Sequence, residues 1–102
     1  MSVAAISWAW KQKTGSAETK VLLVVLANCT DFNGACWPSL EELAAETEMD
    51  AARVKTCLRE LEAAGFIFGA RSGHAPGRRR VIVLLSDDIS RGYARTLGMK
   101  AA

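Results

Sequence analysis

The stretch Cys36-Trp37-Pro38-Ser39-Leu40-Glu41-Glu42-Leu43 predicts the start of a short helix. Ser39 is followed three residues later by Glu42, the pattern of a capping box in which each side chain satisfies a backbone amide at the helix start. Leu40, Leu43 and Ala44 recur at helical spacing and give this helix an apolar face. Residues 48–50 then break the pattern, and Asp50 can cap a second helix over about residues 51–64.

The second helix has an apolar stripe and a clear end. Val54, Leu58 and Leu61 follow one another at i, i+4 and i+7, and Gly65 is placed to end the helix in a left-handed conformation. Beyond it, residues 66–68 and 81–85 are β-prone runs joined by the glycine-containing loop 72–77. These runs predict a hairpin with a basic tip.

Three further segments surround this region. Upstream, Ser16 can cap a helix whose residues 20–29 are apolar on nearly every side, which indicates a central helix. Downstream, a tail helix begins at residues 86–88, with Ile89, Tyr93 and Leu97 on one stripe. Within the N-terminal residues 1–15, residues 6–10 alternate large apolar and small side chains, over too few positions to separate an extended arm from a short helix. Their Trp8 and Trp10 either cover the protein's own core or form a subunit interface.

Together these elements predict one domain of a mainly α fold with a small β-hairpin, in a winged helix-turn-helix arrangement with a C-terminal tail helix. The expected boundaries are an N-terminal arm over residues 1–15, the winged helix-turn-helix domain over 16–85, and a C-terminal helix and tail over 86–102.

The chain resembles the winged helix-turn-helix domains of phage and plasmid replication and regulatory proteins. The resemblance rests on Lys20-Val21-Leu22-Leu23, Cys36-Trp37-Pro38-Ser39, Leu43-Ala44 and the run Leu58-Arg59-Glu60-Leu61-Glu62-Ala63-Ala64-Gly65-Phe66-Ile67. It implies a DNA-binding fold. The chain departs from the family at Glu48, a position that is often glycine, and at Ala51 and Ala52, where polar residues are common.

Charge is distributed unevenly along the 102 residues. The formal net charge is only +2, yet residues 1–50 carry three lysines against seven acids and residues 51–102 carry ten basic groups against four acids. The first half is therefore at −4 and the second at +6. Such asymmetry indicates that one face of the molecule meets a polyanion.

The helix over residues 51–64 is the predicted DNA-reading element, because a B-DNA major groove admits one α-helix. Opposite its apolar stripe it presents five candidate contact residues: Ala52, Arg53, Lys55, Thr56 and Arg59. Arg53 and Arg59 are candidates for guanine, since a guanidinium can bind O6 and N7 together. Thr56 offers a hydroxyl or a methyl group to thymine, and Lys55 is expected at a phosphate.

The hairpin tip, or wing (residues 71–80), supplies Arg71, Arg78, Arg79 and Arg80 for the DNA backbone or the adjacent minor groove. Successive strand residues point to opposite faces, so Arg78–Arg80 do not all contact one duplex. Either Arg78 and Arg80 act together or Arg79 inserts alone. Ser39, at a helix start with free amide groups, is a further phosphate candidate.

The sequence gives little support for a catalytic or metal-binding site. His74 is the sole histidine and has no triad or zinc partners nearby in the sequence, and Cys29, Cys36 and Cys57 lack metal-ligand spacing. We therefore expect no enzyme, no cofactor, no metal and no small-molecule substrate. The longest apolar run is too short for a membrane span. The odd cysteine count and the absence of a signal-like start predict buried free thiols and a cytoplasmic protein, in the bacterial cytosol or nucleoid.

Two functions remain. In the first, the chain binds specific double-stranded DNA as a small regulator or replication accessory factor. It would then work as a homodimer through its terminal segments, where Trp8, Trp10, Ile89, Tyr93 and Leu97 lie. In the second, it is a protein-interaction module whose acidic residues Glu41, Glu42, Glu46 and Glu48 dock a basic partner.

Overall fold

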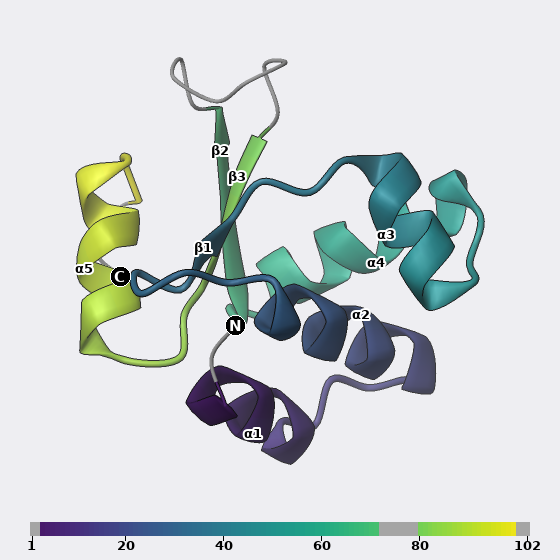
Figure 1. Ribbon diagram of the computed structural model, residues 1–102, viewed down its shortest axis with the longest axis horizontal. Helices are drawn as coiled ribbons and strands as arrows, with labels where there is room; N and C mark the ends of the chain where they lie inside the picture. The colour runs from purple at the N-terminus through teal and green to yellow at the C-terminus, as the bar shows by residue number, and fades with distance from the viewer. Residues whose placement is uncertain (1–2, 72–79, 100–102) are drawn as a thin grey trace.

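The computed structural model describes residues 3–71 and 80–99, in which helices surround a small sheet (Figure 1). In chain order the elements are α1 (Val3–Lys11), α2 (Ala17–Asn28), β1 (Ala35–Cys36), α3 (Leu40–Thr47), α4 (Ala51–Ala63), β2 (Ile67–Arg71), β3 (Arg80–Leu84) and α5 (Asp88–Thr96). The expected fold class is confirmed: the chain is mainly helical, with a small antiparallel sheet arranged as in a winged helix-turn-helix.

The helices begin where their capping residues predict. Ser16 Oγ, Ser39 Oγ and Asp50 Oδ1 each accept the backbone N–H three residues further on, at 3.2, 3.0 and 2.7 Å. Each bond satisfies an amide that lacks a partner within its own helix. At the other end of α4, Gly65 adopts a φ of 85°, the left-handed conformation expected there.

The structure resolves the two alternatives for the N-terminal segment, because residues 3–11 form the helix α1. This helix packs against α2 through the buried Ala5 and Ala9. Trp8 is half-buried against the core and meets Phe66 edge to face at 6.4 Å between ring centroids. Trp10 instead remains 59% exposed. Trp8 therefore covers the protein's own core, whereas Trp10 does not.

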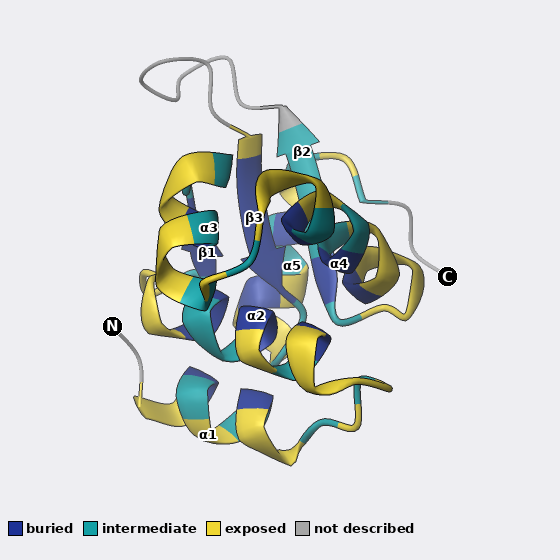
Figure 2. Cartoon of the chain, turned by 90° about the vertical axis from the view of Figure 1, so that its right-hand side faces the viewer, coloured by how far each residue is buried: buried dark blue, intermediate teal, exposed yellow. Residues whose placement is uncertain are grey.

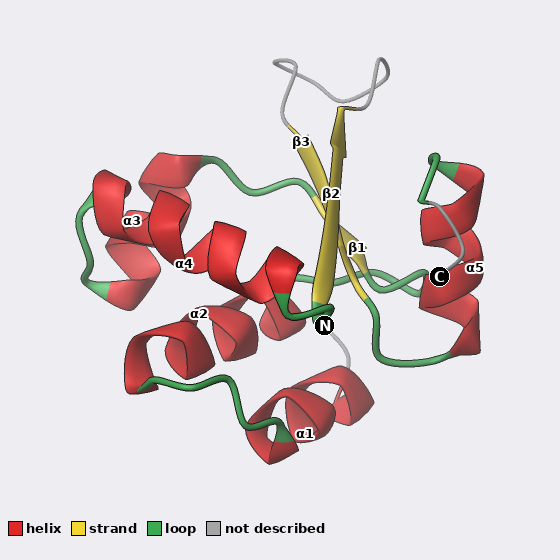
Figure 3. Cartoon of the chain, turned by 180° about the vertical axis from the view of Figure 1, so that it is seen from behind, coloured by secondary structure: helices red, strands yellow, loops and turns green. Residues whose placement is uncertain are grey.

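The sheet separates two hydrophobic clusters. Along β3, Ile82 and Leu84 join the large cluster beneath α1–α4, while Val81 and Val83 join a smaller cluster beneath α5. This alternation follows from the two-residue period of a strand. As a result β3 is buried along nearly its whole length (Figure 2), and α5 lies on the opposite side of the sheet from α3 and α4 (Figure 3).

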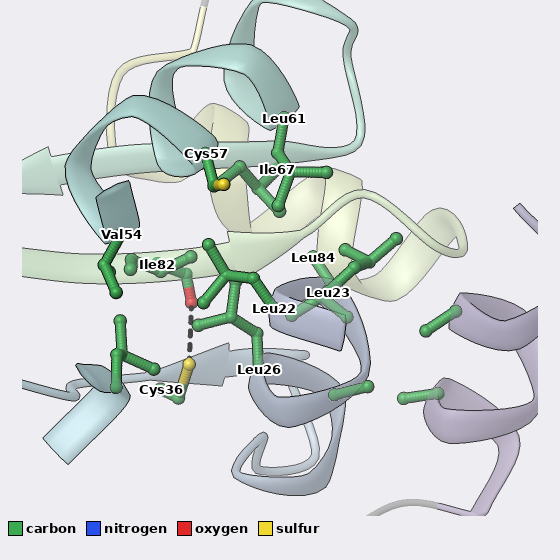
Figure 4. Packing of buried hydrophobic residues seen from close by; sticks show 14 residues of the cluster. Leu22, Leu23, Leu26, Cys36, Val54, Cys57, Leu61, Ile67, Ile82 and Leu84 are labelled. Atoms are coloured by element: carbon green, nitrogen blue, oxygen red, sulfur yellow. Dashed lines mark hydrogen bonds between the residues drawn. The ribbon is translucent and has the colours of Figure 1, made fainter. Parts of the chain in front are cut away.

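The larger cluster is centred on α2, as the apolar composition of that helix predicts. Leu22, Leu23 and Leu26 are fully buried and lie among side chains from α4 and the sheet (Figure 4). This packing fixes α4 relative to the sheet.

The hairpin expected from the sequence is one part of a three-stranded sheet with the order β1-β3-β2. β1 consists of Ala35 and Cys36, which pair antiparallel with Val83 and Ile82. The expectation of a two-stranded wing was incomplete, because two residues after a turn carry no recognisable strand period.

The predicted stripe of the tail helix is also corrected. The buried residues of α5 are Ser90 and Ala94, whereas Ile89 is 50% exposed. Ser90 is buried because α5 approaches the turn before β1 closely: a Cβ added at Gly34 would lie 2.7 Å from the Ser90 Cβ. Tyr93 and Leu97 are half-buried and pack against the smaller cluster as expected.

The prediction of buried thiols holds for two of the three cysteines. Cys36 and Cys57 are buried, whereas Cys29, at the end of α2, is exposed. The sequence expectation was wrong for Cys29 because it is the C-cap of α2, where the chain turns away from the core.

Candidate nucleic-acid interface

α4 is held so that one side faces the core and the other faces solvent. Val54, Cys57 and Leu61 are buried and secure the helix against the large cluster, and Leu58 packs beside them half-buried. On the opposite side Ala52, Lys55 and Arg59 are exposed. The predicted division of this helix into an apolar and a cationic side is therefore present in the structure.

The exposed side of α4 nevertheless has a centre and two flanks. At about 100° per residue, Ala52 and Arg59 lie opposite the buried stripe, whereas Arg53 and Lys55 are about 160° apart around the helix axis. Arg53 faces the start of α2, and Lys55 faces the sheet. The structure thus places Arg59 at the centre of the surface and separates Arg53 from Lys55.

Arg53 is engaged by a residue that the sequence interpretation did not single out for it. Its Nη2 lies 2.7 Å from Oε1 of Glu18, in the first turn of α2, and the two side chains are 40% and 47% exposed. This hydrogen bond raises the pKa of the Arg53 guanidinium and lowers the pKa of the Glu18 carboxyl. The residues are 35 positions apart, so no local sequence pattern indicates the pair.

Thr56 also has an internal partner. Its hydroxyl donates to the Ala52 carbonyl oxygen at 3.1 Å, one helical turn earlier, and the residue is half-buried. With its proton committed to the helix, the side chain presents its methyl group and an acceptor oxygen to solvent.

A groove joins α4 to the base of the wing. Its volume is about 440 Å³, and its lining is contributed by Pro38, Leu40, Leu43, Lys55, Leu58, Arg59, Glu62, Ile67, Gly69, Arg80 and Ile82. Because strand residues alternate, Arg80 shares the face of Ile82 and Leu84, which is the α4 side of the sheet. The structure therefore brings three predicted contact residues, Lys55, Arg59 and Arg80, to a single groove.

The wing itself is described only at its base. Arg71 and Arg80 are partners in the antiparallel register of β2 and β3. Arg80 is exposed. The predictions for Arg78, Arg79 and the loop histidine His74 lie outside the described residues.

Ser39 lies beside the same groove, since its neighbours Pro38 and Leu40 both line it. Its Oγ accepts the Glu42 amide, and Glu41 and Glu42 occupy the first turn of α3. These carboxylates offset the positive end of the helix dipole. Phosphate binding at Ser39 remains a prediction.

α3 carries the acidic surface noted in the sequence. Glu41, Glu42, Glu46 and Glu48 are all exposed, and they lie on or just after this helix. The surface is therefore electrostatically divided, with carboxylates on α3 and cations on α4 and at the start of β3.

Comparison with known proteins gives one result. A family model described as a helix-turn-helix domain matches residues 16–67, which span α2, α3 and α4 and reach the first residue of β2. Searches of the curated proteins and of the solved structures found no match. No helix in the described ranges 3–71 and 80–99 is long and apolar enough to cross a membrane. The matched segment covers half of the chain and contains both the turn between α3 and α4 and the cationic helix. The chain therefore belongs to the helix-turn-helix domain family, and such a domain indicates DNA binding in general.

Proposed function

We propose that the chain is a sequence-specific double-stranded DNA-binding protein, a small transcriptional regulator or replication accessory factor of a phage or plasmid. In this proposal α4 enters the major groove and the wing (residues 71–80) contacts the backbone or the adjacent minor groove. The observation that carries it is the convergence of Lys55, Arg59 and Arg80, from two separate elements, on the solvent side of the helix-turn-helix unit. No catalytic activity is part of the proposal.

The proposal assigns different roles to the residues of α4. Arg59, at the centre of the exposed face, is the main candidate for a guanine, and Ala52 and Thr56 beside it suit the methyl group of thymine. Lys55 and Arg80, with Arg71, Arg78, Arg79 and Ser39, are assigned to phosphates or the minor groove. Arg53 is a peripheral contact that must leave Glu18 before it can bind a base.

A gel-shift titration of random duplex DNA at low salt, followed by selection of bound sequences from a random pool, tests the proposal. Changing Arg53 and Arg59 together to alanine should cost about 1–3 kcal/mol of specific binding per lost base contact. Arg95→Ala removes an exposed arginine of α5 and serves as the matched control. Unaltered binding by the double variant would remove α4 from its assigned role.

The same gel-shift experiment can test whether the ion pair between Glu18 and Arg53 limits DNA binding. Glu18→Gln removes the carboxylate that holds Arg53, so it should strengthen DNA binding. Glu46→Gln makes the same charge change on the exposed side of α3, where no described cation is paired with it, and controls for the gain of one net charge. If both variants strengthened DNA binding equally, the gain would come from the change in net charge and not from the release of Arg53.

We further propose that two copies bind together, because one domain of this size spans only a short site. In the expected division, residues 16–85 form the DNA-binding domain and the ends 1–15 and 86–102 supply the contact. Trp8, Tyr93 and Leu97 pack in their own chain, which leaves the exposed Trp10 and Ile89 as the terminal apolar side chains of such an interface. Light scattering at high protein concentration tests this, and a monomer would contradict it.

The alternative function is a protein-interaction module. It is favoured by the exposed carboxylates of α3 and by the two alanines at the start of α4, which offer no polar group to a base. Absence of any DNA binding by the folded wild-type protein at low salt would favour this alternative. For either function we propose a location in the bacterial cytosol or nucleoid.

A further inference from the structure

The groove between α3, α4 and the base of the β2–β3 hairpin has two distinct kinds of lining. Its walls are apolar side chains from four elements and the segment before α3: Pro38, Leu40, Leu43, Leu58, Ile67 and Ile82. Lys55, Arg59 and Arg80 add three cations. A volume of about 440 Å³ falls within the range of pockets that bind small organic molecules.

Cations outnumber carboxylates in the lining of the groove, three to one. In the described part of the chain, no carboxylate lies within ion-pair distance of Lys55, Arg59 or Arg80. The single carboxylate of the lining, Glu62, accepts the backbone N–H of Gly69 at 2.9 Å and is thereby held at the wall. The groove therefore combines an apolar interior with a net positive charge and an anchored acid.

Gly69 keeps the wall between Glu62 and Arg80 open. A Cβ at this position would lie 2.9 Å from Glu62 Oε1 and 3.1 Å from Arg80 Nη2, so both side chains border the space that the missing Cβ leaves. The guanidinium of Arg80 thus lies at the wall of the groove and does not extend away from it.

We propose that this groove binds a small amphipathic anion, a monocarboxylate with a short aliphatic or aromatic body, and that this ligand and DNA exclude each other. The apolar body would displace water from the leucine and isoleucine side chains, and the carboxylate would meet the planar guanidinium of Arg59 or Arg80. Exclusion follows because the same three cations belong to the DNA surface. This second part rests on the proposed function, whereas binding of the anion does not.

The ligand class is tested without DNA, by following the backbone amide resonances of the free protein during titration with butanoate, hexanoate and octanoate. Burial of each added methylene should raise the affinity by up to about fourfold until the groove is filled. Octanol and octylammonium are the matched probes, with the same chain and no negative charge. Failure of octanoate to bind, or equal binding of the alcohol or the amine, would overturn the proposal.

Variants locate the site. Arg59→Ala, an exposed change, should weaken octanoate binding by about tenfold or more through loss of one charge-assisted hydrogen bond, while Arg95→Ala on α5 should leave the affinity unchanged. Gly69→Ala should also lower the affinity, because the added methyl group occupies the wall of the groove. Unchanged affinity in both Arg59→Ala and Gly69→Ala would place the anion elsewhere and overturn the assignment.

A competition experiment separates the two parts of the inference. Octanoate at saturating concentration should release the wild-type protein from duplex DNA, and octanol should not. If the protein binds octanoate but no DNA, the proposed function fails while the ligand site stands. If it binds both at once with unchanged affinities, mutual exclusion is overturned.

Discussion

Glu48 joins α3 to α4 in an unfavourable backbone conformation. Its φ is 60°, and it is the sole residue other than glycine with a positive φ within the described ranges. A side chain with a Cβ is strained there, which explains why this position is often glycine in the winged helix-turn-helix domains that the sequence resembles.

Replacing Glu48 with glycine should therefore stabilise the protein by about 0.5–1 kcal/mol, since the relief of strain exceeds the added entropy of the unfolded chain. Urea denaturation followed by circular dichroism measures the change. Glu46→Gly removes the same side chain from the regular part of α3 and should destabilise by a similar amount. A destabilised Glu48→Gly variant would contradict this account of the turn.

The cysteines should differ in reactivity. Cys29 is exposed as a residue, but partial desolvation of its thiol raises the pKa, and the charges of Glu46 and Glu42 raise it further. Burial raises the pKa of the Cys36 thiol to about 12. Because the thiolate is the reactive form, iodoacetamide should modify the exposed Cys29 first, more slowly than in the unfolded chain and faster as the pH rises beyond 9.

Mass spectrometry of the folded protein measures this order, and labelling in urea gives the unfolded reference. Glu46→Gln should speed the reaction of Cys29 at pH 8, whereas Glu41→Gln, a change on the same helix whose charge does not act on Cys29, should not. Early labelling of Cys36 or Cys57 would show that the core opens more readily than its packing implies.

At the scale of elements, α5 supports the sheet from which the wing extends. It covers the face of the sheet that bears Val81 and Val83, and its Ala94 is fully buried there. The sheet without α5 would expose this apolar face to water. The tail helix thus supports the strand that carries Arg80.

Ala94→Asp should consequently destabilise the protein by several kcal/mol, because it buries a charge without a partner. Arg95→Asp, one residue further on the exposed side of α5, should cost only about 1 kcal/mol, because its charge meets the negative end of the helix dipole but stays in water. Thermal melting of both variants makes the comparison. Similar stabilities would mean that α5 does not hold the sheet.

How much of the fold the sequence predicts depends on the kind of signal. Helix starts at Ser16, Ser39 and Asp50 follow from local side-chain chemistry and are confirmed. β1 and the packing face of α5 depend on tertiary contact: Ala35 and Cys36 are extended because β3 lies beside them, and Ser90 is buried because Gly34 admits it. No local pattern encodes such contacts.

The candidate site shows the same division. Periodicity predicts which residues of α4 face solvent, because the buried stripe fixes the opposite side. It does not reveal that Glu18 binds Arg53 or that Arg80 shares a groove with Arg59, since both arrangements join residues from separate elements. The DNA contacts themselves remain predictions.

On the scale of the whole molecule, the positive charge of the second half predicts the salt dependence of DNA binding. If about six of its basic groups meet phosphates, the plot of log affinity against log salt concentration should have a slope near −5. Fluorescence anisotropy with a labelled duplex over a range of salt measures it. Arg80→Ala should make the slope shallower by about one, and a wild-type slope near zero would contradict phosphate binding.

The pairing of β1 with β3 has a consequence for a complex with duplex DNA. By pairing with β3, the two residues of β1 connect the segment that leads into α3 to the central strand of the sheet. The segment that leads into α3 and the strand that carries Arg80 are thus joined by backbone pairing. If this pairing keeps α4 and the wing at one spacing in a complex, a duplex whose grooves do not match that spacing has to bend or twist, and flexible base steps are then favoured even where no side chain touches them.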